Sequence, residues 1–154
     1  MSLCLDVYVW VPEQSAETFE RFINTYVNMD NPGDQRVHAF RRAYVLGTAN
    51  EADDRALDEL RPEGWDGAFT LYVRARDHHQ AMIAITRDGA TVLGLSIEAP
   101  DDQSETLRQA ERLLRQLRHQ FSAPAGLAGV ELPPPWDLSD WHQQDLALLR
   151  VGEP

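Results

Sequence analysis

The 154-residue chain lacks lysine, has one cysteine, and has no apolar run approaching the ~20 residues that a membrane-spanning helix needs. A lone Cys4 excludes an intramolecular disulfide framework and any cysteine-based metal cluster. Residues 1–11 lack the basic start of a secretory signal and include Asp6. We therefore expect a cytoplasmic protein, and we interpret the missing lysine as the codon usage of a GC-rich bacterial genome.

Positive charge is scarce as well, because fourteen arginines face twenty-five acidic residues and leave a formal net charge of −11. Such a balance opposes binding to nucleic acids and anionic membranes, where attraction to Lys and Arg supplies most of the affinity. A basic protein is the partner that the charge favours. Solubility alone explains the charge equally well.

A β-hairpin over residues 82–98 is the most clearly indicated local structure. Large apolar residues occupy odd positions on both sides of Asp88-Gly89, which is typical of two strands joined by a turn. A three-residue loop, 87–89, with Gly89 in the left-handed conformation would keep Ile83 and Ile85 on the same face as Leu93.

The rest of the chain predicts further strands at 3–11 and 69–76 and a short one at 129–132, with amphipathic helices at about 15–28 and 103–121. The pattern of residues 34–47 does not distinguish a strand from a helical turn leading into one, and we predict a strand at about 40–46. Thr48 to Glu51 predicts a capping box that opens a short helix ending near Leu60.

These elements predict an α+β fold, in which both amphipathic helices pack on one face of a mostly antiparallel sheet of four or five strands. Residues 1–122 form the α+β unit. Residues 123–154 form a tail containing proline and tryptophan, which we expect to fold back on the same single domain, since a disordered tail is poor in tryptophan and leucine.

Motifs for catalysis are missing: the chain has no HExxH, GxSxG, P-loop or GxGxxG sequence. Asp77, His78 and His79 lie in a predicted turn, where solvated side chains are the commoner outcome. We therefore assign no catalytic residue, metal site or cofactor, and favour a protein that is not an enzyme.

One group of residues has the composition of a binding surface. If the odd-numbered faces of strands 3–11 and 69–76 both meet the core, the opposite face carries five side chains that are aromatic or basic: Tyr8, Trp10, Tyr72, Arg74 and Arg76. Aromatic residues and arginine are enriched in protein-binding hot spots. The tail, residues 133–149, could equally lie across this face and make it a second core.

Three functional hypotheses follow. The first is a non-catalytic, acidic protein-binding module, for example an inhibitor or immunity-type protein that masks a basic partner. The second is a small enzyme or ligand-binding domain with a pocket between sheet and helices that uses Asp77, His78 or His79. The third is a homo-oligomer, such as a homodimer, joined through the aromatic sheet face.

Overall fold

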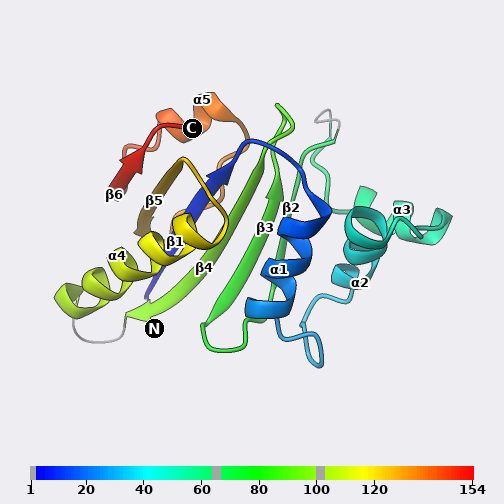
Figure 1. Ribbon diagram of the computed structural model, residues 1–154, viewed down its shortest axis with the longest axis horizontal. Coiled ribbons are helices and arrows are strands. Elements are labelled where there is room, and N and C mark those ends of the chain that lie inside the picture. The colour runs from blue at the N-terminus through cyan, green and yellow to red at the C-terminus, as the bar shows by residue number, and fades with distance from the viewer. Residues whose placement is uncertain (1–2, 64–66, 100–102) are drawn as a thin grey trace.

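The computed structural model describes residues 3–63, 67–99 and 103–154, and shows a six-stranded antiparallel sheet with its helices mainly on one side (Figure 1). The strands are β1 (Leu3–Val11), β2 (Phe69–Val73), β3 (Gln80–Ile85), β4 (Thr91–Ala99), β5 (Ala125–Val130) and β6 (Ala147–Gly152). The helices are α1 (Ala16–Tyr26), α2 (Arg36–Arg41), the π-helical turn η1 (Arg42–Leu46), α3 (Glu51–Asp58), α4 (Gln103–Gln120) and α5 (Leu138–His142). The α+β class is confirmed, but four or five strands and two helices was too low a count for the described residues.

The strand order β2-β3-β4-β1-β5-β6 places β1 in the middle of the sheet, next to β4 and β5. Strands β2, β3 and β4 form a meander. In the hairpin, Ile83 pairs with Leu93 and Ile85 with Thr91, and Gly89 has a φ of 81°. The predicted register and the left-handed glycine are therefore confirmed.

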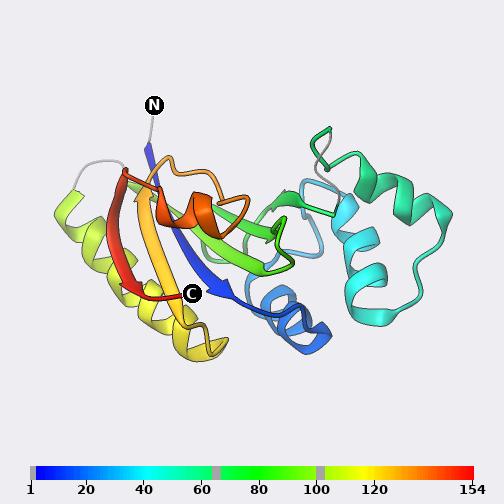
Figure 2. The ribbon, with the colours of Figure 1, turned by 90° about the horizontal axis from the view of Figure 1, so that it is seen from above.

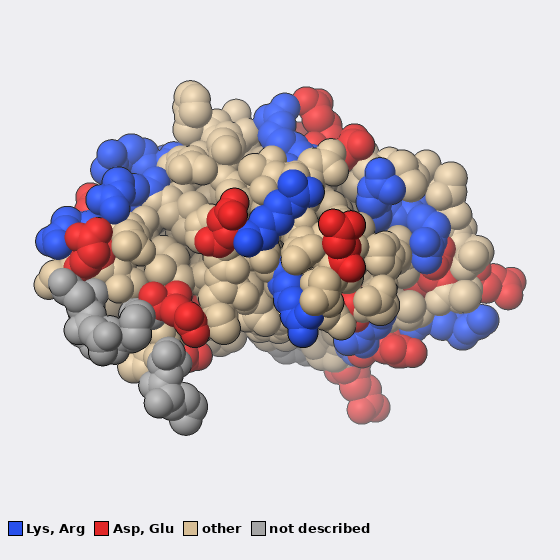
Figure 3. Space-filling view, turned by 90° about the horizontal axis from the view of Figure 1, so that it is seen from below, with Lys and Arg blue, Asp and Glu red and all other residues tan. Residues whose placement is uncertain are grey.

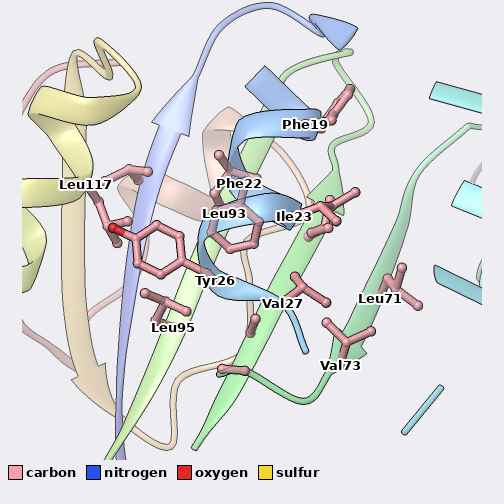
Figure 4. Packing of buried hydrophobic residues seen from close by; sticks show 14 of the residues in the cluster. Phe19, Phe22, Ile23, Tyr26, Val27, Leu71, Val73, Leu93, Leu95 and Leu117 are labelled. Carbon is pink, nitrogen blue, oxygen red and sulfur yellow. The ribbon is translucent and has the colours of Figure 1, made fainter. Parts of the chain in front are cut away.

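The odd-numbered residues of β1 to β4 form one face of the main core. Helices α1 and α4 cover this face, whereas α5 lies on the other side of the sheet (Figure 2). In Figure 4, Phe22, Ile23 and Tyr26 of α1 point toward Leu93 and Leu95 of β4, with Leu117 of α4 beside them. The predicted amphipathic stripes therefore do bury against one sheet face.

Residues 40–46, predicted as a strand, are helical. Phe40 ends up stacked on Tyr44, with ring centroids 4.8 Å apart, and Phe19 and Phe69 pack against the edges of these rings. This aromatic cluster buries one side of α2 and η1, whereas a β-strand would place the rings of Phe40 and Tyr44 on one face but about 13 Å apart, too far to stack. Tertiary packing thus overrides the strand propensity of Tyr44 and Val45.

The following helix, α3, begins later than predicted. The capping box uses Asn50 and Asp53 instead of Thr48 and Glu51: Asp53 N–H donates to Asn50 Oδ1 at 2.9 Å, and Asn50 N–H donates to Asp53 Oδ2 at 3.1 Å. Arg42 adds a bidentate pair to the Asp53 carboxylate at 2.7 and 2.8 Å, which lowers the pKa of that carboxyl group. One carboxylate thus joins the start of α3 to η1.

The C-terminal residues are more ordered than the sequence indicated. The strand predicted at 129–132 instead spans β5, Ala125–Val130, and β6 was not predicted at all. Between the two strands, residues 131–146 cross the even-numbered face of the sheet and include α5 (Figure 2). We call residues 131–146 the strap.

Candidate functional site

The strap decides which part of the predicted aromatic face is accessible. Beneath it lies a second apolar cluster, and Tyr8 and Trp10 are both buried there. The Trp10 and Trp141 rings meet edge to face with centroids 5.5 Å apart, and Tyr8 Oη–H donates to the carbonyl oxygen of Leu132. Tyr8 and Trp10 are therefore not accessible to another molecule in this structure. Of the two alternatives that the sequence left open, a second core is the one present here.

The other three residues of the predicted face are not under the strap, although Tyr72 lines a hollow of about 540 Å³ together with the edge of Tyr8. Tyr72 is 43% exposed and shares a hollow of about 470 Å³ with Arg74, whereas Arg76 lines a different cleft on the helix side of the sheet. The reason is that β2 ends at Val73, and the chain then bridges to Val27 through Ala75. Arg76 Nε–H donates to the carbonyl oxygen of Val27 at 3.0 Å. Burial still alternates through Ala75 and Arg76, but the chain there pairs with Val27 instead of β3, and the five residues do not form one surface.

Asp77, His78 and His79 do line one common cleft, of about 650 Å³. The cleft lies between the β2–β3 connection, the end of β4 and α4. The cleft is also lined by Arg76, Ile97, Glu98, Gln109, Arg112, Leu113 and Gln116. Figure 3 shows this end of the molecule, where arginines and acidic residues are interspersed and no field of one sign forms.

The two histidines in the cleft have different surroundings. The His78 ring packs against Tyr26 with centroids 6.1 Å apart, and burial lowers the pKa of His78 although Asp77 opposes the shift. His78 Nδ1 is sealed from solvent and has no hydrogen-bond partner among the described residues. His79 Nδ1 lies 3.7 Å from a carboxylate oxygen of Glu98 at the surface. The pair therefore resembles one packed ring and one solvated ring more than a joint acid–base device.

Sequence reasoning missed the buried carboxylate of Asp6. Asp6 is 8% exposed, and its carboxylate accepts hydrogen bonds from Ser96 Oγ and from the backbone N–H of Leu132, the latter at 2.8 Å. Burial raises its pKa to about 6, although both hydrogen bonds and the nearby His79 oppose the shift, and Glu131 adds to it. The signal in the sequence was an acid at an even position of an otherwise aromatic strand face.

Asp6 fixes the beginning of the strap, and other contacts fix the rest of it. Arg87 N–H donates to the carbonyl oxygen of Trp136 at 2.8 Å, and Leu138 N–H donates to Asp88 Oδ2 at 3.0 Å. At the far end, the Arg150 guanidinium donates to the carbonyl oxygens of Trp141 and Gln144. The strap is therefore held along its length by the hairpin and by β6.

The outer surface of the strap is acidic. Residues 131–146 contain Glu131, Asp137, Asp140 and Asp145 and no arginine or lysine. Among the described residues, only Asp137 has an arginine at ion-pair distance, Arg87 at 3.7 Å. In α3, by contrast, Asp53 and Asp58 are each paired with an arginine. Asp137 and Asp140 are half-buried and accept backbone hydrogen bonds within the strap, whereas Glu131 and Asp145 are exposed. The strap thus presents two exposed carboxylates that have no arginine at ion-pair distance among the described residues.

Apolar side chains are exposed at the C-terminal end of the strap and just after it. Leu146 is 73% and Leu148 57% exposed, and Leu148 borders a hollow of about 310 Å³. This hollow lies between the starts of β1 and α4 and the neighbouring ends of β5 and β6, and its apolar lining is Leu3, Leu5, Leu107, Val130 and Leu148. An acidic surface and an apolar one therefore adjoin at the C-terminal side of the sheet.

The described part of the chain has neither a metal-binding cluster nor a membrane-spanning helix. No group of three or more His, Cys, Asp or Glu side chains there is arranged to hold a metal ion. Of the helices in residues 3–63, 67–99 and 103–154, none combines the length and apolar character needed to cross a membrane.

No family model matches this chain, and no curated protein or solved structure matches it either. Its function has to be argued from its own surface.

Proposed function

We propose that this protein is a non-catalytic, acidic binding module that masks a basic protein partner, in the manner of an inhibitor or immunity protein. The observation that carries the proposal is the strap, which places uncompensated carboxylates and exposed leucines side by side on a fixed segment. A cytoplasmic location is part of the same proposal.

Anchoring of the strap supports binding over mere solubility. A disordered acidic tail would have to be ordered on binding, at a cost in conformational entropy, whereas residues 131–146 are already held by the hairpin and by β6. Buried Trp141 fixes their middle. Solubility requires charge but no such positioning.

The charge of the whole chain supports a basic partner. A net charge of −11 attracts a cationic protein over a long range and accelerates encounter, and a negative surface rejects acidic competitors. Masking requires both fast association and apolar contacts that slow dissociation. The acidic residues of the strap favour fast association, and the exposed Leu146 and Leu148 provide the apolar contacts.

The test is binding to the product of the adjacent gene, since an inhibitor and its target are commonly encoded together. Association rates are measured by stopped flow for the wild type, for Asp145→Asn on the strap and for Glu20→Gln on the exposed side of α1 as the control. We expect association to slow for Asp145→Asn and at high salt, because the screening length falls from about 10 Å at 0.1 M to about 3 Å at 1 M. An acidic partner, or rates insensitive to salt, would refute the proposal.

A second function has one observation in its favour, namely that Asp77, His78 and His79 all line the 650 Å³ cleft with Arg76 and Arg112. Such a cleft suits a small anionic ligand or substrate. Adding inorganic phosphate or succinate while following the ring signals of His78 and His79 by NMR tests this. Saturable shifts that disappear in Arg112→Gln would favour a ligand-binding or enzymatic role, and unshifted signals would exclude these anions.

A further inference from the structure

Strand β6 is an open edge of the sheet. The strand order ends with β6 on one side and β2 on the other, and within the described residues β6 pairs only with β5. On the other side of the sheet, the chain pairs only with residues that follow β2: Arg74 N–H donates to Pro32 O at 2.8 Å and Asn28 N–H donates to Arg74 O at 2.9 Å. The outer backbone groups of β6 have no strand partner among the described residues and are left for another strand.

Apart from an irregularity in its pairing with β5 at Ala128 and Gly129, β6 lacks the sequence features that usually protect an edge strand. Natural edges carry lysine, proline or inward-pointing charge that discourages pairing. Residues 147–152 contain no proline, and their single charge, Arg150, is drawn back to the carbonyl oxygens of Trp141 and Gln144. Leu148 and Val151 are exposed instead. This composition favours strand addition.

An apolar hollow adjoins the same edge. The space of about 310 Å³ beside Leu148 is lined by Leu3, Leu107 and Val130, among others, and it is large enough for an apolar side chain. Peptides that add a strand to a sheet gain affinity from main-chain hydrogen bonds and specificity from such side-chain pockets. Edge and hollow together therefore make one docking site.

The charges at the ends of β6 indicate its occupant. Asp145 precedes the strand and Glu153 follows it, and both are exposed. Antiparallel pairing of β6 with a second copy would bring Asp145 of each chain beside Glu153 of the other, between two molecules of net charge −11. A strand from a basic protein, with Lys or Arg on both sides of its apolar part, would meet opposite charges at both ends.

We propose that β6 accepts an extended, apolar segment of the basic partner, flanked by Lys or Arg, as a seventh strand of the sheet. The proposal rests on the proposed function and identifies the part of the partner that binds. The segment pairs with the outer edge of β6, inserts one apolar side chain beside Leu148, and places its cationic ends near Asp145 and Glu153.

The direct test uses a synthetic peptide of alternating valine and threonine flanked by pairs of arginines. Amide signals of the ¹⁵N-labelled protein are followed during titration. We expect saturable shifts at Leu148–Val151 and not in β2. Leu148→Asp should raise the Kd about tenfold or more, because a carboxylate would replace an apolar contact. Leu46→Asp, an equally simple change at an exposed leucine on η1, is the matched control and should bind as the wild type does.

Three results would overturn this inference. They are a lack of shifts in β6, equal binding of a peptide flanked by glutamates, and a dimer in sedimentation experiments that Leu148→Asp dissociates, which would make a second copy the occupant. The proposed function is tested separately. If a basic partner binds with an affinity that depends on Asp145 but not on Leu148, the binding module stands and strand addition is excluded.

Discussion

Replacing Asp6 by asparagine should change how stability depends on pH. The Asp6 carboxyl has a pKa of about 6 in the folded protein, above its ordinary value of 3.8, because it is buried beneath the strap. The folded state therefore binds this proton more tightly than the unfolded state. Its contribution to stability is complete below pH 3.8 and is lost as the pH rises to about 6. A difference of about two pKa units corresponds to about 3 kcal/mol.

Asparagine cannot ionise, but its side-chain oxygen can still accept the hydrogen bond from Leu132 N–H. We therefore expect the free energy of unfolding of Asp6→Asn, relative to the wild type, to increase by about 2 kcal/mol between pH 4 and pH 7, most of the full difference. Comparing the two proteins at each pH cancels the contribution of carboxylates with lowered pKa values, such as Asp34 and Glu105, whose stabilisation is lost as the pH falls.

Urea unfolding at several pH values measures this difference. Emission from the buried Trp10 and Trp141 reports the transition. Glu20→Gln, which removes one negative charge from the exposed side of α1, is the control for net charge. A difference between Asp6→Asn and wild type that stays constant from pH 4 to pH 7, or that falls, would show that the buried carboxylate does not carry the cost assigned to it.

Two substitutions test the packing beneath the strap, and a third tests backbone strain at the end of η1. Trp141→Ala should lower the free energy of unfolding by about 3–5 kcal/mol in urea titrations, because it removes the edge contact with Trp10 and leaves a cavity. Gly94→Ala places a methyl group against the Tyr8 ring and should cost about 1–3 kcal/mol in the same assay, and no loss would mean that Tyr8 moves freely. Gly47→Ala has open space but a φ of 67°, so a cost of about 1–2 kcal/mol is expected from backbone strain alone, and a neutral result by thermal unfolding would contradict it.

Alternation and amphipathic spacing predicted the main core well, because each such element has one buried face. The strand at 3–11 matches β1 in both bounds, and the odd-face register of the hairpin is correct. Helix 15–28 extends past α1 by one residue at its start and two at its end, and helix 103–121 differs from α4 by one residue at its end only. These elements bury whole rows of side chains, so their periodicity is strong in the sequence.

The failures occurred where single contacts decide the structure. Gly126 and Gly129 weakened the strand pattern of β5, yet each glycine has a packing reason. A Cβ at Gly126 would overlap the Leu114 side chain, and one at Gly129 would lie 2.9 Å from the carbonyl oxygen of Leu146. Glycine inside a strand often marks such a close approach. Nothing in local composition distinguishes it from a loop glycine.

The candidate site was predictable only in part. The sequence indicates which residues share the sheet face, but it does not indicate which segment buries them. Tyr8, Trp10 and Tyr72 were placed on one face by alternation, and Tyr8 and Trp10 do lie together. Which segment covers them depends on Asp6 meeting Leu132 and on Trp141 meeting Trp10, contacts between residues more than 120 positions apart. Long-range pairs of this kind leave no periodic signal.

The strap changes where a partner can bind. Had the even-numbered face been open, Tyr8 and Trp10 would have offered an aromatic surface without regard to the partner's charge. With the strap in place, their area stabilises the fold, and the accessible surface beside it carries the acids of residues 131–146 and the leucines of β6. Under the proposed function, this surface would select a partner for positive charge first and for apolar shape second. We propose that the segment that closes the second core also favours a basic partner.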